Sequence, residues 1–366
     1  MHERFSAMLS NLKSLNYGRV FLVLIVLVSL EICMRTFVTN GTFETINFAR
    51  QEQQSQNNLN SEAWDNKFLN ATSHLTLNTR GRDIPTIPIT GKNISVKTSF
   101  EETKRKLDQR NQMLRGNCSL IRNLKSPVVT AIDMRRNYFI EEYDFFLCVS
   151  AKGGATTWKT HMLQMKGLPG QNVHKGYNEK RIRAGSARLA DRISGKVTSV
   201  ISVRHPLTRL VSAYGDKFGD GKAFAGVPRF LRMVRYFTNS WGKPVTFYQF
   251  LSYVIYQAKR GPSMTNNHWR PISWNCKPCT GNFDYIIKLE TIDEDLAYLV
   301  TDLGIKEINV QLKYNVKNSK AKVKGYESYF KSLPPAMLKD IYNIYKYDFI
   351  LFDYVVPQFM LDAVAS

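Results

Sequence analysis

The sequence predicts an α/β fold with a mainly parallel central sheet that is flanked by helices. Short apolar, β-branched runs are separated by long stretches, as in strands joined by crossover helices. The expected strands are residues 145–150, 197–203 and 283–289. Apolar residues at helical spacing follow the first two runs and recur near the end of the chain. The expected helices are residues 158–165, 206–218 and 334–347.

Length and charge limit the classes of function. With 366 residues and 43% hydrophobic content, the chain can bury one large catalytic core and still carry appendages. Its formal net charge of +21 predicts a positive field that attracts polyanions. Nucleic acid, an anionic membrane and an acidic glycan are all polyanionic partners of this kind. The sequence leaves the oligomeric state open.

The first part of the chain predicts a membrane anchor. Residues 20–30 are apolar without interruption, and the basic residues before them predict a cytosolic N-terminus. We therefore expect a cytosolic tail over 1–19 and a signal-anchor transmembrane helix over 20–34, as in a single-pass type II membrane protein. A cleaved signal peptide is the alternative, although no clear small-x-small cleavage site follows.

The polar composition of residues 35–126 predicts a flexible stem, with a helix over 100–114 near its end, before a lumenal domain over 127–366. Four glycosylation sequons precede the motifs described below. Their asparagines are Asn40, Asn70, Asn93 and Asn117. Sequons beyond an anchor indicate a lumenal location and argue against nucleic acid as a partner.

Four cysteines follow the predicted anchor: Cys118, Cys148, Cys276 and Cys279. In an oxidising lumen they can form two disulfides, in any of three connectivities. Half of a zinc site at Cys276 and Cys279 is the alternative. No second CxxC or closely spaced histidine pair accompanies it, so we expect no metal.

The stretch after the first predicted strand has the composition of a phosphate-binding turn. Small residues allow backbone N–H groups to approach a phosphate, lysines neutralise it and threonines donate hydrogen bonds. The candidate binding residues are Lys152, Gly153, Gly154, Ala155, Thr156, Thr157, Trp158 and Lys159. Against the ATP-binding P-loop pattern, Trp158 stands where the second glycine is needed.

The end of the second predicted strand carries Arg204 instead of an acidic residue that could hold magnesium. Arg204 and Ser212 suit a second phosphate, through a charge-assisted fork and a hydroxyl. A solvated basic helix is the alternative. Both motifs together predict a metal-free site for a doubly phosphorylated nucleotide.

These motifs resemble those of the Golgi carbohydrate sulfotransferases that include the chondroitin and dermatan 4-O-sulfotransferases. Residues 152–159 resemble the 5′-phosphosulfate loop of that family, and residues 204–212 its 3′-phosphate motif. The likeness continues in order over about residues 140–354. It departs at Ala151-Lys152-Gly153-Gly154, where the family usually has Pro-Lys-Val-Gly, and at Asp353, where it has glycine.

The resemblance implies a P-loop-like sulfotransferase fold and an enzyme of the Golgi membrane with a lumenal catalytic domain. The donor would be 3′-phosphoadenosine 5′-phosphosulfate, and the acceptor an anionic glycan, with the 4-hydroxyl of GalNAc in chondroitin or dermatan as the expected target. Lys152 would stabilise the leaving phosphate, and Arg204 with Ser212 would hold the 3′-phosphate. His174 is the expected general base, and His268 is the alternative.

Two other functions remain open at this point. One is a nucleotide-dependent kinase of P-loop ancestry, and the other is a type II membrane protein that binds glycans without catalysis.

Overall fold

The computed structural model describes most of the chain from Val96 onward. The described residues are 96–121, 136–222, 226–311 and 325–366. The predicted tail, the predicted anchor and the sequons at Asn40, Asn70 and Asn93 therefore lie outside them. Across the described ranges, every helix is too short or too polar to cross a membrane.

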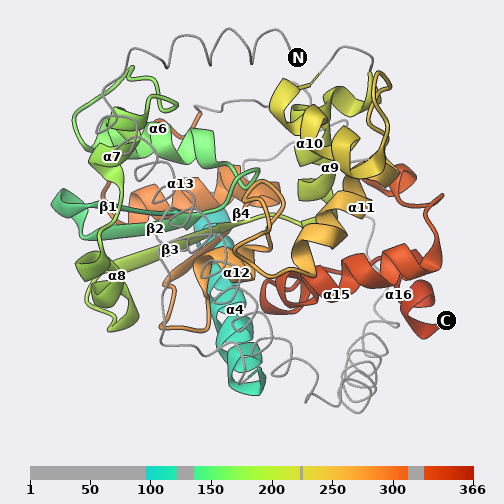
Figure 1. Cartoon of the computed structure of the whole chain (residues 1–366). Coiled ribbons are helices and arrows are strands. Elements are labelled where there is room, and N and C mark those ends of the chain that lie inside the picture. Colours follow the sequence, from blue (N-terminus) through green and yellow to red (C-terminus); the bar gives the residue numbers. More distant parts are fainter. Residues whose placement is uncertain (1–95, 122–135, 223–225, 312–324) are drawn as a thin grey trace, which may run out of the picture. The chain divides into compact units, whose positions relative to one another are not determined.

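A four-stranded mixed sheet with the order β1-β2-β3-β4 lies at the centre (Figure 1). Its strands are β1 (Asn137–Ile140), β2 (Phe145–Val149), β3 (Thr198–Val203) and β4 (Tyr285–Lys288). β2, β3 and β4 run parallel, as predicted, whereas β1 pairs antiparallel with β2. β1 was not predicted. It has only four residues and is joined to β2 by a tight turn, so no long apolar run reveals it.

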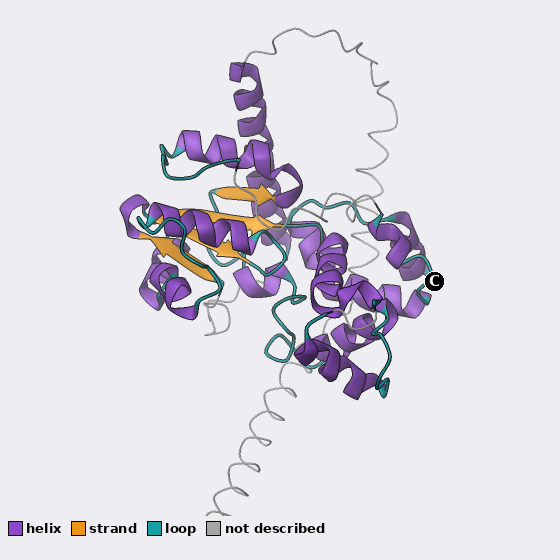
Figure 2. Cartoon of the chain, turned by 90° about the horizontal axis from the view of Figure 1, so that it is seen from above, coloured by secondary structure: helices purple, strands orange, loops and turns teal. Residues whose placement is uncertain are grey.

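Side chains of the central strands alternate between two buried faces. In β2, Phe145, Leu147 and Val149 pack on one face, and Phe146 and Cys148 pack on the other. Burial on both faces is expected of parallel strands covered by helices, and Figure 2 shows helices on either side of the sheet.

The two faces are covered mainly by different helices. The first face carries α6 (Ala155–Met165) and α13 (Ile292–Asp302). The second carries α8 (Ser186–Ile193) and α12 (Ile272–Cys276). Helix α4 (Val96–Leu120) contributes to both, through Leu107 on the first face and Leu114 on the second. The short helix α7 (Gly176–Ile182) packs beside α6 and β1. The predicted helix at 158–165 is thus confirmed and begins three residues earlier, at Ala155.

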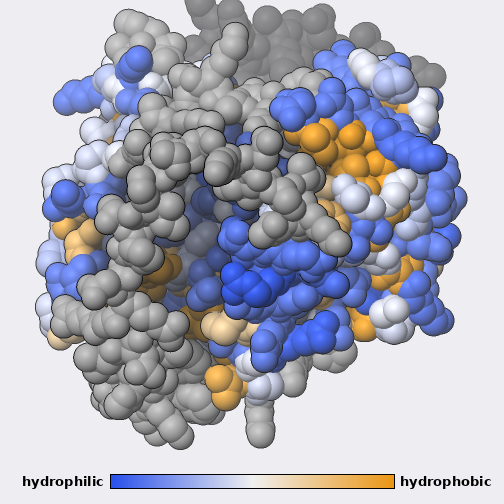
Figure 3. All heavy atoms as spheres, turned by 180° about the vertical axis from the view of Figure 1, so that it is seen from behind, coloured by the Kyte–Doolittle hydropathy of each residue, from blue (hydrophilic) through white to orange (hydrophobic). Residues whose placement is uncertain are grey.

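A second cluster of helices packs beside the sheet around an aromatic core (Figure 1). These helices are α9 (Pro206–Phe218), α10 (Pro228–Thr238), α11 (Phe247–Ala258), α15 (Pro335–Leu351) and α16 (Gln358–Ala365). α9 begins at Pro206 as predicted, because the fixed φ of proline suits the first helical position. Seen from behind, the described surface is mostly hydrophilic with separate hydrophobic patches (Figure 3).

Helix α4 lies within the stretch assigned to the stem on sequence grounds, yet it packs against the sheet. Its Leu107 and Leu114 are buried. Arg110 donates a hydrogen bond to the Ile286 carbonyl of β4 and pairs with the buried Asp295 at 2.5 Å. The side-chain amide of Asn117, in the fourth sequon, donates to the carbonyl of Ile350.

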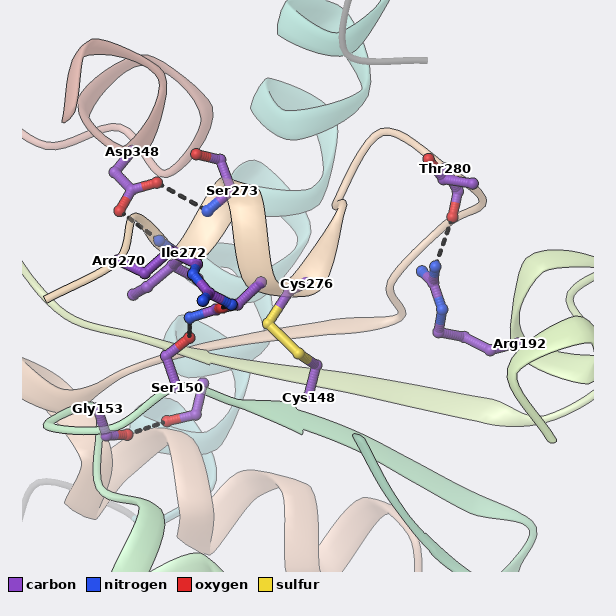
Figure 4. Close-up of a disulfide and its surroundings, with 12 residues drawn as sticks. Cys148, Ser150, Gly153, Arg192, Arg270, Ile272, Ser273, Cys276, Thr280 and Asp348 are labelled. Carbon is purple, nitrogen blue, oxygen red and sulfur yellow. Dashed lines mark hydrogen bonds between the residues drawn. A yellow bond between two sulfur atoms is a disulfide. The ribbon is translucent and has the colours of Figure 1, made fainter. Parts of the chain in front are cut away.

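Two disulfides select one of the three possible connectivities. Cys118 pairs with Cys279, and Cys148 pairs with Cys276. The CxxC stretch thus bonds to two different elements. Cys148–Cys276 joins β2 to α12 across 128 residues of sequence (Figure 4). Closing a loop of this length stabilises a fold by roughly 3–5 kcal/mol in the chain-entropy treatment.

Candidate active site

The loop between β2 and α6 is shaped by its two glycines. The Gly153 N–H donates to the carbonyl of Ser150, and the Gly153 carbonyl accepts from the Ser202 hydroxyl of β3 (Figure 4). A Cβ on Gly153 would lie 3.2 Å from the Ser150 oxygen. Gly154 has φ of 89°, which favours glycine. The extra glycine at 153 therefore has a packing reason in this chain.

The N-terminus of α6 opens from this loop with its first-turn N–H groups uncapped by any side chain. Gly154 is the N-cap residue, and the first turn holds no acidic residue. Ala155 and Thr156 are half-buried, so solvent reaches this end of the helix. Unpaired N–H groups and the positive end of the helix dipole make such a terminus suitable for an anion.

Lys152 lies beside that helix end and is held by an acidic residue of α9. Its Nζ lies 3.2 Å from the Asp216 carboxylate, which also pairs with Lys217 at 2.9 Å. Burial lowers the pKa of Lys152, and Asp216 opposes that change. Burial alone would raise the pKa of Asp216, but Lys152 and Lys217 outweigh it and lower this pKa.

Arg204, at the end of β3, contacts the same loop. Its Nη1 donates to the Lys152 carbonyl at 3.1 Å, and its Nε donates to the Thr208 hydroxyl at 3.1 Å. Burial lowers its pKa. Arg204 precedes α9, and positions 208, 212 and 216 follow at intervals of four along one side of that helix. The structure thus brings Lys152, Arg204 and the stripe that contains Ser212 together.

Three predicted donor residues lie away from the open side of the loop. Trp158 is 1% exposed and stacks on Phe145 in the core, so it underlies the loop. The buried Lys159 points toward α7, where its Nζ lies 3.9 Å from the Glu179 carboxylate. Thr157 is also buried. The residues that line the open end of the loop are therefore those from Lys152 to Thr156.

The two histidines proposed as bases have different surroundings. His174 is exposed, and only its backbone N–H hydrogen bonds, to the Asn172 side chain. His268 is half-buried between α11 and α12. Its Nδ1 donates to the Asn266 side-chain oxygen at 2.8 Å, which leaves Nε2 as an acceptor.

Several charged groups of the donor loop and α9 act on His268. Burial and the charges of Lys217, Arg136 and Lys152 together lower the pKa of His268 to about 3, while Asp216 opposes them. The imidazole also meets the Phe230 ring edge-on at 5.3 Å, and Lys217 lies over that same ring. Contacts through Phe230, Lys217 and Asp216 therefore connect His268 to Lys152, whereas the described contacts of His174 do not reach Lys152.

Arg209 connects the donor loop to the segment that carries His268. Its side chain is 1% exposed. It donates to the Ala151 carbonyl at 3.2 Å and to three consecutive carbonyls, those of His268, Trp269 and Arg270. Arg209 lies within the predicted 3′-phosphate motif, residues 204–212, but the motif by itself assigned it no role. The sequence signal for its burial was its position between Leu207 and Leu210 on an apolar helix.

Helix α12 ties the same two segments together from another side. The Asp348 carboxylate accepts the N–H groups of Ile272 and Ser273 and so caps this helix (Figure 4). The Asn275 amide donates to the Ser150 hydroxyl at the start of the donor loop. Burial raises the pKa of Asp348.

Within the described ranges, no group of three or more His, Cys, Asp or Glu residues is arranged to hold a metal ion.

Residues 136–355 match the family model described as the sulfotransferase family, so the chain belongs to that family. The sulfotransferase family that the two donor motifs predicted is therefore confirmed, and the protein is a sulfotransferase enzyme.

Three of its relatives are carbohydrate sulfotransferases. Carbohydrate sulfotransferase 11 of Rattus norvegicus is 25% identical over 270 residues, which cover 69% of this chain and 76% of the relative. Carbohydrate sulfotransferase 14 of Homo sapiens is 25% identical over 291 residues, 74% and 75% of the two chains. Carbohydrate sulfotransferase 12 of Mus musculus is 27% identical over 259 residues, 60% of each chain. No solved structure gives a significant match.

Replacing Arg209 should destabilise the fold and the loops of the candidate site together. We expect Arg209→Met to lower the free energy of unfolding by about 3 kcal/mol, because several buried carbonyls lose their donor. Arg232→Met, at an exposed position of α10, is the control and should change it by less than about 0.5 kcal/mol. Urea unfolding measures both. A loss as small as that of the control would show that the loops keep their positions without the guanidinium.

Proposed function

We propose that the protein transfers a sulfuryl group from 3′-phosphoadenosine 5′-phosphosulfate to a hydroxyl group of a glycan. The observation that carries this proposal is the contact between the two donor motifs. Arg204 donates to the backbone of Lys152, at the turn that opens the uncapped N-terminus of α6. A donor with a 5′-phosphosulfate and a 3′-phosphate has two anionic groups, and this pair of motifs offers two cationic positions.

Each group has a role in an in-line transfer. The first-turn N–H groups of α6 would hold the phosphosulfate, and Arg204 with Ser212 would hold the 3′-phosphate. The acceptor oxygen forms a bond to sulfur as the bond from sulfur to the phosphate oxygen breaks. Lys152 would then stabilise the negative charge that develops on the leaving phosphate. Donor binding competes with the Lys152–Asp216 ion pair, while Asp216 keeps Lys217 as a partner.

His268 is the base that the geometry supports for the acceptor hydroxyl. Its Nε2 is left as an acceptor by the hydrogen bond from Nδ1 to Asn266. The lowered pKa keeps the ring neutral, so Nε2 is open to the hydroxyl proton as the oxygen attacks sulfur, and it also makes this imidazole a weaker base than an ordinary histidine. His174, the base first expected, has no such connection to Lys152 among the described contacts.

The acceptor that we propose is an anionic glycan of the chondroitin or dermatan type, sulfated at the 4-hydroxyl of GalNAc. Three findings support a polyanionic carbohydrate. The net charge is +21, the relatives are named as carbohydrate sulfotransferases, and the motifs resemble those of 4-O-sulfotransferases. The family match favours this function over a kinase or a binding protein without catalysis.

Donor binding provides the direct test. We expect the lumenal part of the chain to bind 3′-phosphoadenosine 5′-phosphate without magnesium, and to move labelled sulfate from the donor to chondroitin. Changing Lys152 and Arg204 together to Ala should weaken donor binding at least about 100-fold, because two charge-assisted contacts are lost. Isothermal titration measures binding, and linkage analysis of the product identifies the hydroxyl. Binding of ATP only with magnesium, or no effect of the double variant, would exclude this function.

The choice of base is tested by paired variants and by pH. We expect His268→Asn to lower kcat by about 100-fold or more, and His174→Asn to leave it nearly unchanged. For the wild type, kcat/KM should stay level from pH 7 to about pH 5, because the pKa of His268 is about 3. The opposite pattern in the two variants would move the base to His174.

Stability should depend on His268 in the same pH range. Unfolded histidine binds a proton below its ordinary pKa of about 6.5, whereas folded His268 does not. The wild type should therefore lose stability as the pH falls below about 6.5, by roughly 2 kcal/mol at pH 5, and His268→Asn should lose less.

We further propose a single-pass type II location in the Golgi membrane, with the catalytic domain in the lumen. The apolar run before residue 34 and the sequons at Asn40, Asn70 and Asn93 support it. Full-length protein expressed in animal cells should lose apparent mass on treatment with an N-glycosidase. Changing those three asparagines to Gln should remove most of that loss. Protein that carries no glycan and stays in the cytosol would contradict the location.

A further inference from the structure

The ring of Phe230, on α10, contacts the candidate base and two cations. The ring is buried and meets the His268 imidazole edge-on, with centroids 5.3 Å apart and planes at 81°. The Arg229 guanidinium carbon lies 5.0 Å from the centroid of the Phe230 ring, and Lys217 Nζ lies 5.5 Å from it. Two positive groups and the base therefore share one neighbour.

The two cations differ in whether a carboxylate of the chain already pairs with them. Lys217 is 2.9 Å from Asp216, so an acidic residue already balances part of its charge. Arg229 is exposed, and among the described residues no carboxylate lies within ion-pair distance of it. It stands in the first turn of α10, which contains no acidic residue. The positive end of the helix dipole adds to its charge there and favours an anion from outside the chain.

The charges that face His268 come from several elements and are mostly positive. Lys152 belongs to the donor loop, Arg136 precedes β1 and Lys217 belongs to α9, and each of them lowers the pKa of His268. Asp216 is the acidic residue that opposes them. The bound donor would balance the charge of Lys152, and an acceptor with a carboxylate next to the reacting sugar would add a partner for the cations on the acceptor side.

We propose that Arg229, supported by Lys217, binds the carboxylate of the uronic acid residue adjacent to the acceptor sugar. The planar guanidinium offers two parallel N–H donors that match a carboxylate. Arg229 would thereby place the neighbouring hydroxyl at His268 and select acidic over neutral glycans. This inference rests on the proposed function. It assigns Arg229 and Lys217 to the acceptor, and Lys152 and Arg204 to the donor.

The test compares two acceptors on three variants. The acceptors are chondroitin and carboxyl-reduced chondroitin, in which the uronic acid is converted to a neutral sugar. The variants are Arg229→Ala, Arg229→Lys and the control Arg232→Ala. Arg232 is an exposed arginine of the same helix, and among the described contacts it has none with Phe230. Initial rates with labelled donor give the KM for acceptor and for donor separately.

We expect Arg229→Ala to raise the KM for chondroitin about 10-fold, with the KM for donor unchanged, because a bidentate contact is lost. Arg229→Lys should fall between Arg229→Ala and the wild type, since it keeps the charge and loses the fork. With carboxyl-reduced chondroitin, the wild type and Arg229→Ala should have the same KM. Arg232→Ala should behave as the wild type with both acceptors.

Two results would overturn the inference. One is an equal effect of Arg229→Ala on both acceptors, which would show that the arginine does not read the carboxylate. The other is an unchanged KM for chondroitin in that variant. A wild type that binds the donor but sulfates neither acceptor would refute the proposed glycan transfer itself, and with it this inference. That outcome is distinguishable because it appears without any substitution.

Discussion

The hydrogen bonds of one buried guanidinium, that of Arg209, fix the donor loop and the His268 segment relative to each other. Burying a charge without partners is costly, and here both terminal nitrogens of the guanidinium donate to carbonyl groups from two separate loops, while Nε is buried without a partner among the described residues. One loop carries Lys152, which would face the leaving group, and the other carries His268, which would face the attacking hydroxyl. The separation between these two groups therefore depends on a side chain that need touch neither substrate.

Other contacts make that arrangement stiff. Cys148–Cys276 joins the strand before the donor loop to the helix after the His268 segment. The Tyr345 hydroxyl donates to the Trp269 carbonyl, which Arg209 also contacts. A site for in-line transfer needs the nucleophile, the electrophile and the leaving group held in line, so a cross-braced frame of this kind matches the chemistry. The glycines of the donor loop suit the same frame, because a Cβ at position 153 would lie only 3.2 Å from the Ser150 carbonyl oxygen and would require a small shift of the loop.

Much of the fold could be predicted from the sequence because its signals are local. The β2 run is apolar, the β3 run is rich in β-branched residues, and Pro206 marks the start of α9. β1 and the packing of α4 could not be predicted in the same way. Four residues give no measurable period, and the polar surface of α4 conceals the buried Leu107 and Leu114. Their burial depends on contacts with β4 and α13, which lie far away in sequence.

The sequence by itself determined the family and the two donor motifs, since backbone approach to phosphate needs small residues and basic groups at fixed local spacing. Only the tertiary structure decided how these residues are arranged. Lys159 pairs with Glu179 and Trp158 enters the core, while Arg209 links the Ala151 carbonyl of the donor loop to the distant His268 segment. The physical reason is the separation along the chain between the residues that determine each feature. A turn or a helix start is set by neighbouring residues, whereas the surroundings of a side chain are set by whichever segments pack against it.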